Sequence, residues 1–179
     1  MMVFLFAAAA IAFVGAVIDF RTGHIPNWLT LGGWAGALIA HFAYGAHEDG
    51  LGFGLTEVGR ALFGSLACAA VPLFMYAKGG MGGGDVKLFA AIGALALPLA
   101  GLEAQTYTFV AALLIAPARL AYDGTLLRTL KNTLSLLVNP LRKKETRAPV
   151  PEELKTWFRL GPSIFLGVLA TLLTHWDPQ

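Results

Sequence analysis

Six long stretches of this 179-residue chain contain no Asp, Glu, Lys or Arg, and this pattern limits the possible folds more than any other feature. The stretches are 1–18, 22–47, 61–77, 88–102, 104–118 and 160–176. A helix needs roughly 20 apolar residues, and at least about 17, to cross the hydrocarbon core of a membrane. Neutral neighbours extend the two shortest stretches toward this length. The pattern predicts a polytopic membrane protein and excludes a soluble enzyme, a nucleic-acid-binding module and a disordered chain.

The expected fold class is all-α, because only helices and closed barrels satisfy the backbone in lipid, and the runs lack the alternation of a barrel strand. Only 13% of the residues are charged, against about a quarter in soluble domains. We expect a single membrane-embedded domain, 1–179, in which Pro72, Pro98 and Pro117 kink their helices. Six transmembrane helices are predicted, at about 2–19, 28–46, 59–77, 86–102, 104–122 and 160–176.

The segment 124–158 is the only long connection between the predicted spans. Its first half places leucines on one helical face and basic residues such as Arg128 and Lys131 on the opposite face. This pattern predicts an amphipathic helix in the cytoplasmic interface of the membrane, with lipids as its partners.

The basic residues indicate how the chain is oriented. If the first span runs from outside to inside, all 13 Lys and Arg except Arg60 lie on the inner side. This distribution follows the positive-inside rule. The outer loops carry acidic residues instead, among them Glu48, Glu57 and Glu103. We therefore expect a multi-pass protein of the cytoplasmic (inner) membrane with both termini outside.

Two carboxylates stand at the inner ends of predicted helices. Asp19 follows the first apolar run, and Asp85 follows a glycine-rich segment and precedes the run that begins at Leu88. Two acids at matched depth can meet, and nearby carboxylates share a proton because both do not ionise easily. One can then take a proton from water while the other polarises a peptide carbonyl. The pair predicts aspartic-protease chemistry that faces the cytoplasm, and neither role is assigned to one residue.

The glycines before Asp85 fit this interpretation. Gly82, Gly83 and Gly84 would let the backbone approach a bound peptide closely. A phosphate-binding loop is excluded because the segment has neither GxGxxG nor GxxxxGK spacing. Taken singly, Asp85 could cap a helix and Asp19 could be a boundary charge, but together they favour catalysis. No metal or cofactor is expected, because the histidines and the single cysteine lack ligand spacing.

These residues resemble the signatures of the type IV prepilin peptidase family. Gly82-x-Gly84-Asp85 is similar to the GxGD motif of that family, and Asp19-x-Arg21 with Ile25-Pro26-Asn27 is similar to its other motif. The stretch 159–167 is similar to a later family motif. The resemblance implies an intramembrane aspartyl endopeptidase that removes the short basic leader of prepilins or pseudopilins at the cytoplasmic face. It implies Asp19 and Asp85 as the catalytic pair.

The same motifs contain Arg21, Pro26, Asn27 and Lys87, which we expect to shape the site together with the three glycines. Larger family members add a domain with paired CxxC motifs and methylate the new amino terminus. With one cysteine, the chain resembles the short, peptidase-only branch of Tad/Flp pilus systems, so no methyltransferase activity is expected.

Other interpretations remain open at this point. Archaeal preflagellin peptidases are also similar to the chain. A proton-coupled transporter could use a pair of acids, although such acids are expected nearer the middle of the membrane. Presenilin-like GxGD proteases carry Tyr-Asp and Pro-Ala-Leu motifs, which this chain lacks, and a purely structural subunit would leave the Asp–glycine arrangement unexplained. The sequence identifies neither the pilin substrate nor the oligomeric state.

Overall fold

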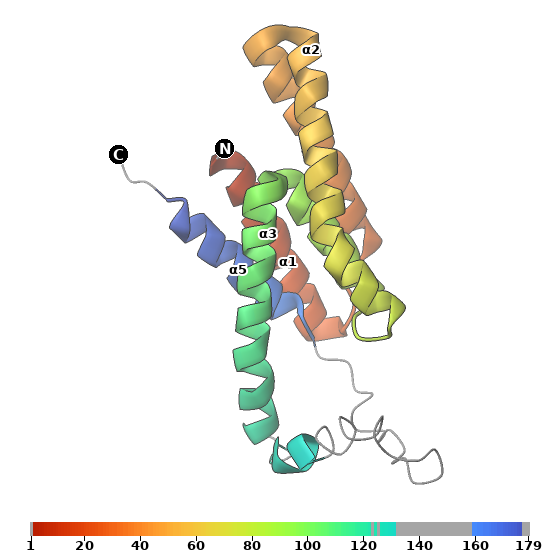
Figure 1. Cartoon of the computed structure of the whole chain (residues 1–179), viewed down its shortest axis with the longest axis vertical. Coiled ribbons are helices and arrows are strands. Elements are labelled where there is room, and N and C mark those ends of the chain that lie inside the picture. Colours follow the sequence, from red (N-terminus) through yellow and green to blue (C-terminus); the bar gives the residue numbers. More distant parts are fainter. Residues whose placement is uncertain (1, 123, 125, 132–158, 177–179) are drawn as a thin grey trace, which may run out of the picture. The chain divides into compact units, whose positions relative to one another are not determined.

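The computed structural model describes residues 2–122, 124, 126–131 and 159–176. All regular structure in these residues is helical, which confirms the predicted all-helical class. By length and composition, α1, α2 and α3 are able to cross a membrane, and α5 is a shorter apolar helix. The helices are α1 (Met2–Thr22), α2 (Asn27–Ala77), α3 (Gly83–Tyr122) and α5 (Gly161–Thr174) (Figure 1).

The chain divides into two compact units, which are residues 1–112 together with 159–179, and Leu113–Phe158. The first unit holds α1, α2, α5 and the larger part of α3, and it contains both predicted catalytic residues. The second unit holds the end of α3 and the helical residues 126–131. The rest of the predicted amphipathic segment 124–158, apart from Gly124, lies outside the described residues.

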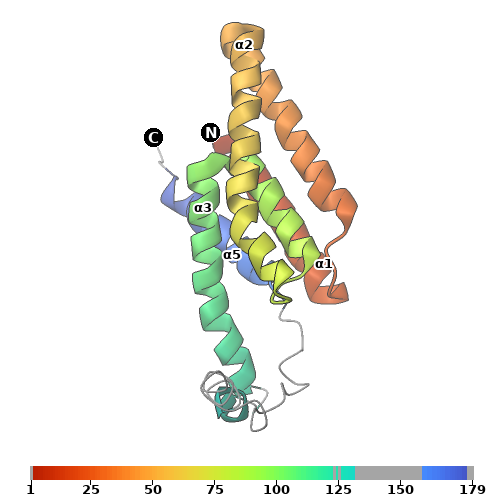
Figure 2. The same cartoon turned by 45° about the vertical axis from the view of Figure 1, so that its right-hand side comes forward.

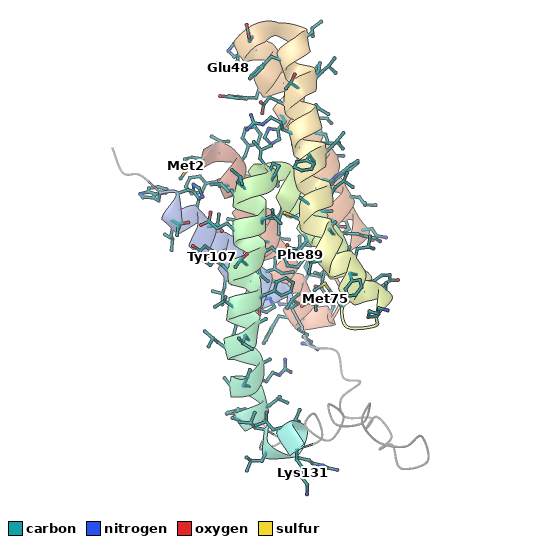
Figure 3. All side chains as sticks on the ribbon, viewed as in Figure 1. Met2, Glu48, Met75, Phe89, Tyr107 and Lys131 are labelled. Carbon is teal, nitrogen blue, oxygen red and sulfur yellow. The ribbon has the colours of Figure 1, made fainter. Side chains whose placement is uncertain are left out.

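The 51-residue helix α2 turns back on itself. A straight helix of this length would extend roughly 75 Å, far more than a bilayer core of about 30 Å. The helical dihedral angles are interrupted at Asp49 (φ −145°, ψ 30°) and Gly50 (φ 80°, ψ 179°). Two antiparallel arms result, which lie side by side and both extend to the same side of this break (Figure 1 and Figure 2). Glu48 lies at the break and Met75 near the far end of the second arm (Figure 3).

Small residues let the two arms of α2 approach each other. A Cβ atom built on Gly45 would lie 2.9 Å from the Cα atom of Gly54, so no larger side chain fits there without movement. Farther along, Trp34 Nε1 donates a hydrogen bond of 3.0 Å to Ser65 Oγ. The two arms therefore form a hairpin with tight contacts.

Helix α3 is interrupted at Leu97, the one non-glycine residue with positive φ in the described part of the chain (φ 64°, ψ 172°). Pro98 follows it, lacks an N–H donor and disfavours helical angles in the residue before it. The predicted kink at Pro98 is confirmed. At Pro72 and Pro117, by contrast, α2 and α3 continue with helical angles. At Pro72 the cost to the backbone is offset by a side chain. The Cys68 carbonyl, which loses its usual donor to that proline, accepts a hydrogen bond of 2.8 Å from Gln105 Nε2.

Candidate active site

Asp19 lies in the last turn of α1, where the beginning of α5 covers it. Its side chain is buried, with the residue only 6% exposed, and its Oδ2 accepts a 3.0 Å hydrogen bond from the backbone N–H of Gly161. A Cβ atom on Gly161 would stand 2.8 Å from both Cβ and Oδ2 of Asp19. Only glycine fits this approach without a shift of the backbone. The guanidinium of Arg159 also donates to the Phe20 carbonyl and fixes the chain that leads into α5.

Asp19 of α1 caps the N-terminus of another helix, α5. Leu160 stands at the N-cap position of α5 and offers no side-chain hydrogen bond to it. The first N–H groups of a helix have no partner within that helix and favour negative charge. The Asp19 carboxylate accepts one of these N–H groups and thereby joins the C-terminal end of α1 to the N-terminal end of α5.

Asp85 occupies the first turn of α3 and is half-buried. The backbone of Gly82 hydrogen-bonds to its carboxylate, and a Cβ atom on Gly82 would lie 3.1 Å from Oδ2. The turn before it requires Gly79, whose φ of +75° suits glycine and few other residues. The glycine-rich segment therefore positions this carboxylate at the N-terminus of α3.

The two carboxylates approach each other from different helices. They are close enough for the charge of Asp19 to act on Asp85. Each also adjoins the N-terminus of a helix, α5 for Asp19 and α3 for Asp85, and these positive ends favour negative charge. The arrangement can hold two acidic groups whose charges interact, each with polar backbone beside it.

Two contacts hold the loop after α1 and the start of α2 against the start of α3. Ile25, in the loop after α1, is buried, and a Cβ atom on Gly84 would stand 3.2 Å from its Cβ. Lys87 Nζ donates a 2.8 Å hydrogen bond to Asn27 Oδ1, which links the first turn of α2 to the second turn of α3. These residues belong to the two motifs found in the sequence, so the structure brings the two motifs into direct contact.

The remaining residues predicted to shape the site take different places. Gly83 faces the ring of Tyr76 at the end of α2, with 3.4 Å from a Cβ atom to Cε2. Pro26 is half-buried at the N-cap of α2, and Arg21 is exposed. Within this set of seven residues, the hydrogen bond from Lys87 to Asn27 joins two members directly, whereas Gly82 contacts Asp85 and Gly84 contacts Ile25. Among the residues that the structure describes, no three His, Cys, Asp or Glu side chains gather as metal ligands would.

Gly161 is the site residue that the sequence analysis assigned no role. It lies in the stretch 159–167, at the predicted start of the last span and hence at the depth of Asp19. A glycine followed by Pro162 at a helix start was the available signal, since this is where free N–H groups face outward. The partner of those N–H groups is remote in sequence, and the spacing alone did not identify it.

Among known proteins, neither the curated proteins nor the solved structures gave a match. The model of the type IV leader peptidase family matches residues 5–117, a stretch that includes Asp19, Asp85 and both motifs around them. This stretch covers more than half of the chain, and the apolar helices fit an integral membrane protein. The chain belongs to the type IV leader peptidase family.

Proposed function

We propose that this chain is an intramembrane aspartyl endopeptidase. In it, Asp19 and Asp85 catalyse hydrolysis of the peptide bond that joins the leader of a prepilin to the mature pilin. Membership in the leader peptidase family supports a prepilin-type peptidase in general. The observation that carries the assignment is the approach of two carboxylates from different helices, near enough for their charges to interact. Both belong to motifs within the matched stretch.

In the proposed mechanism the two carboxyl groups share one proton. The ionised carboxylate takes a proton from a water molecule, and the resulting hydroxide attacks the carbonyl carbon of the scissile peptide bond. The protonated partner donates its proton to the carbonyl oxygen, and the leaving amine is protonated as the tetrahedral intermediate collapses. The pair acts as a unit, and we assign neither role to one residue.

The inner ends of the helices are proposed to face the cytoplasm. In this proposed topology the chain crosses the inner membrane six times, with the parts of α2 and α3 on either side of the breaks at Asp49–Gly50 and Leu97 counted as separate spans. Both termini then lie outside, and Lys78 and Lys87 lie inside with the site. A basic leader peptide would be attracted to a cytoplasmic site that carries two carboxyl groups.

The substrate is proposed to be a prepilin or pseudopilin of the Flp type, without methylation of the new amino terminus. The chain has one cysteine, and it is buried in α2. A proton-coupled transporter remains less favoured because Asp19 and Asp85 lie at the ends of α1 and α3, and acids of a transport pathway are expected deeper in the spans.

The decisive experiment replaces each acid by its amide. Purified protein in detergent is incubated with a candidate Flp-type prepilin, and leader removal is followed by mass spectrometry. Asp19→Asn and Asp85→Asn should each lower the rate by at least about 1,000-fold, because neither amide can exchange the proton that the mechanism requires. Asp49→Asn is the matched control, since this exposed aspartate lies at the break of α2. Processing at the normal rate by either site variant contradicts the proposal.

A further inference from the structure

A second group of buried polar side chains lies near the other end of α1, at Phe4 rather than at Asp19. His41 and Glu57, one from each arm of α2, are 2% and 4% exposed. Helix α1 alone separates Phe4 from Asp19 by about 22 Å, so the two groups are independent. The catalytic proposal makes no use of the second group.

The imidazole of His41 has one satisfied and one unsatisfied nitrogen. Nε2 lies 3.2 Å from the Leu95 carbonyl oxygen, in the last turn before the break of α3. Because a carbonyl oxygen only accepts, this contact places a proton on Nε2, and in a ring with this single proton Nδ1 is an acceptor. Nδ1 is buried without a hydrogen-bond partner, and Glu57 Oε2 lies 4.0 Å away from it. Two acceptors thus face each other across a gap that lacks a donor.

The gap opens into a cavity of about 320 Å³ whose walls include His41, Glu57 and aromatic rings. Phe4 stacks flat against His41, with ring centroids 4.0 Å apart, and Tyr44 meets the edge of Phe4 at 5.9 Å. Glu48 contributes a further carboxylate to the wall. Carboxylates beside aromatic rings favour an organic cation, and the two facing acceptors require that this cation donates N–H groups. A primary ammonium group meets both conditions, whereas a quaternary ammonium group has no N–H to donate.

Arg60 gives the same cavity a positively charged wall. Its Nη1 donates a 2.7 Å hydrogen bond to Glu57 Oε1, while 57% of its side chain stays exposed. A guanidinium group has five N–H donors in a planar fork that suits phosphate oxygens. Beside the pocket for an ammonium group there is therefore a donor for a phosphate group.

Arg60, Ala96 and Leu97 also line a second cavity of about 630 Å³. Its other walls are mainly apolar and include Phe63 and Leu99, which are 64% and 86% exposed. A polar cavity for a charged headgroup thus shares one wall with an apolar cavity that an acyl chain fits. The charge pattern and the apolar extension point to the same class of ligand.

We propose that these adjoining cavities bind one phospholipid with a phosphoethanolamine headgroup. Its primary ammonium lies between His41 Nδ1 and Glu57 Oε2, at hydrogen-bond distances of about 2.8 Å from each. Its phosphate meets Arg60, and an acyl chain follows the wall at Phe63 and Leu99. The site differs in place and chemistry from the Asp19–Asp85 pair.

Native mass spectrometry of the detergent-purified protein tests this site. Phosphatidylethanolamine, phosphatidylcholine and phosphatidylglycerol with identical acyl chains are added at equal concentration. Phosphatidylethanolamine should be retained about 10-fold more tightly than phosphatidylcholine, because only its headgroup donates hydrogen bonds to the two acceptors. Equal retention of the three lipids would mean that the cavities hold water or non-selective lipid, and the proposal would fall. Retention of soluble phosphoethanolamine as tight as that of the lipid would exclude the acyl-chain cavity as part of the site.

Amino-acid substitutions test which residues produce the preference for phosphatidylethanolamine. Glu57→Gln should reduce the advantage of phosphatidylethanolamine by about 10-fold, because a charge-assisted hydrogen bond is lost. Glu103→Gln makes the same change outside both cavities, beside Thr174 and His175, and should keep the preference. If Glu57→Gln does not fold, Glu48→Gln replaces it, since that exposed residue lines the headgroup cavity and should also weaken the preference. A preference that survives in a folded Glu57→Gln or Glu48→Gln variant contradicts the assignment.

Discussion

At the scale of single residues, the contact between Gly161 and Asp19 decides whether the candidate site can form. The glycine N–H satisfies one carboxylate oxygen, and the missing side chain leaves room for the carboxylate itself. Any larger residue would push α5 away from Asp19. Gly161 is thus expected to act as a positioning residue, which affects the reaction through the orientation of Asp19.

Replacement of this residue tests that role. Gly161→Ala should lower kcat for leader removal by about 100-fold, because small displacements of a reacting group cost this much. KM should change little, since a shift of Asp19 leaves the peptide-binding surface intact. Steady-state kinetics with a prepilin substrate in detergent separate the two constants.

Ser163→Ala is the matched control for Gly161→Ala in the first turns of the same helix. The Ser163 hydroxyl is fully buried without a hydrogen-bond partner, so its removal should leave kcat unchanged and stability equal or slightly higher. Equal losses of kcat in both variants would show that the first turns of α5 tolerate no substitution and that Gly161 has no special effect on Asp19.

The residues of the site could be predicted where one short stretch of sequence was enough to identify them. Asp19 and Asp85 were found because a charge next to a long apolar run is visible in one stretch of sequence. The bond from Lys87 to Asn27 and the contact of Gly84 with Ile25 join residues that are distant in the chain. Such contacts depend on how the helices pack, and no spacing rule within one segment reports them.

At the scale of helices, α2 and α3 depend on glycines where they cross. A Cβ atom on Gly64 would stand 2.3 Å from the Gly93 carbonyl oxygen and 3.0 Å from the Leu97 carbonyl carbon. Small residues of this kind let the backbones of membrane helices approach closely and pack by van der Waals contact. The contact lies beside the break of α3, so it also fixes where the second arm of α3 begins.

Enlarging this glycine should separate the helices. Gly64→Ala is expected to lower the stability by about 1–3 kcal/mol through overpacking, which a lower midpoint of thermal unfolding in detergent would show. Gly52→Ala is the control on the same arm of α2, because a Cβ atom there meets nothing within 4 Å. It should leave stability equal or raise it, by up to about 1 kcal/mol of helix propensity. A stability loss in both variants, or in neither, contradicts the close-packing argument.

The helix boundaries show what charge patterns can and cannot predict. The segment 47–58 was expected to connect two spans, yet it is helical apart from the break at Asp49 and Gly50. Charged residues such as Glu48 and Glu57 mark where an apolar stretch ends, and a helix can continue past that limit into a polar environment. The turn itself depends on the positive φ of one glycine among several in this region, so its position was not predictable from composition.

At the scale of the whole molecule, the proposed topology places the break of α2 outside and the turn between α2 and α3 inside. Asp49 and Lys78 are both exposed and mark these two positions. The chain has a single cysteine, Cys68, which is fully buried. Introduced cysteines can therefore report which side of the membrane each position faces.

Labelling with a membrane-impermeant maleimide tests this topology. Asp49→Cys should react in intact cells, whereas Lys78→Cys should react only after the membrane is permeabilised. The unchanged protein serves as the background, because Cys68 is shielded. The reverse pattern of labelling would place Asp19 and Asp85 on the outer side and remove the basis for cytoplasmic cleavage.

The bond between Asp19 and Gly161 has a consequence for the time at which the protein becomes competent during its synthesis. The ribosome adds Asp19, which accepts the hydrogen bond, near the beginning of translation. It adds Gly161, which donates the hydrogen bond, only after most of the polypeptide has been completed. Until the last helix has left the translocon, the early aspartate has no covering backbone amide. A premature stop codon between Leu88 and the start of α5 would therefore yield an inserted but inactive fragment, even though such a fragment retains both acids and both motifs.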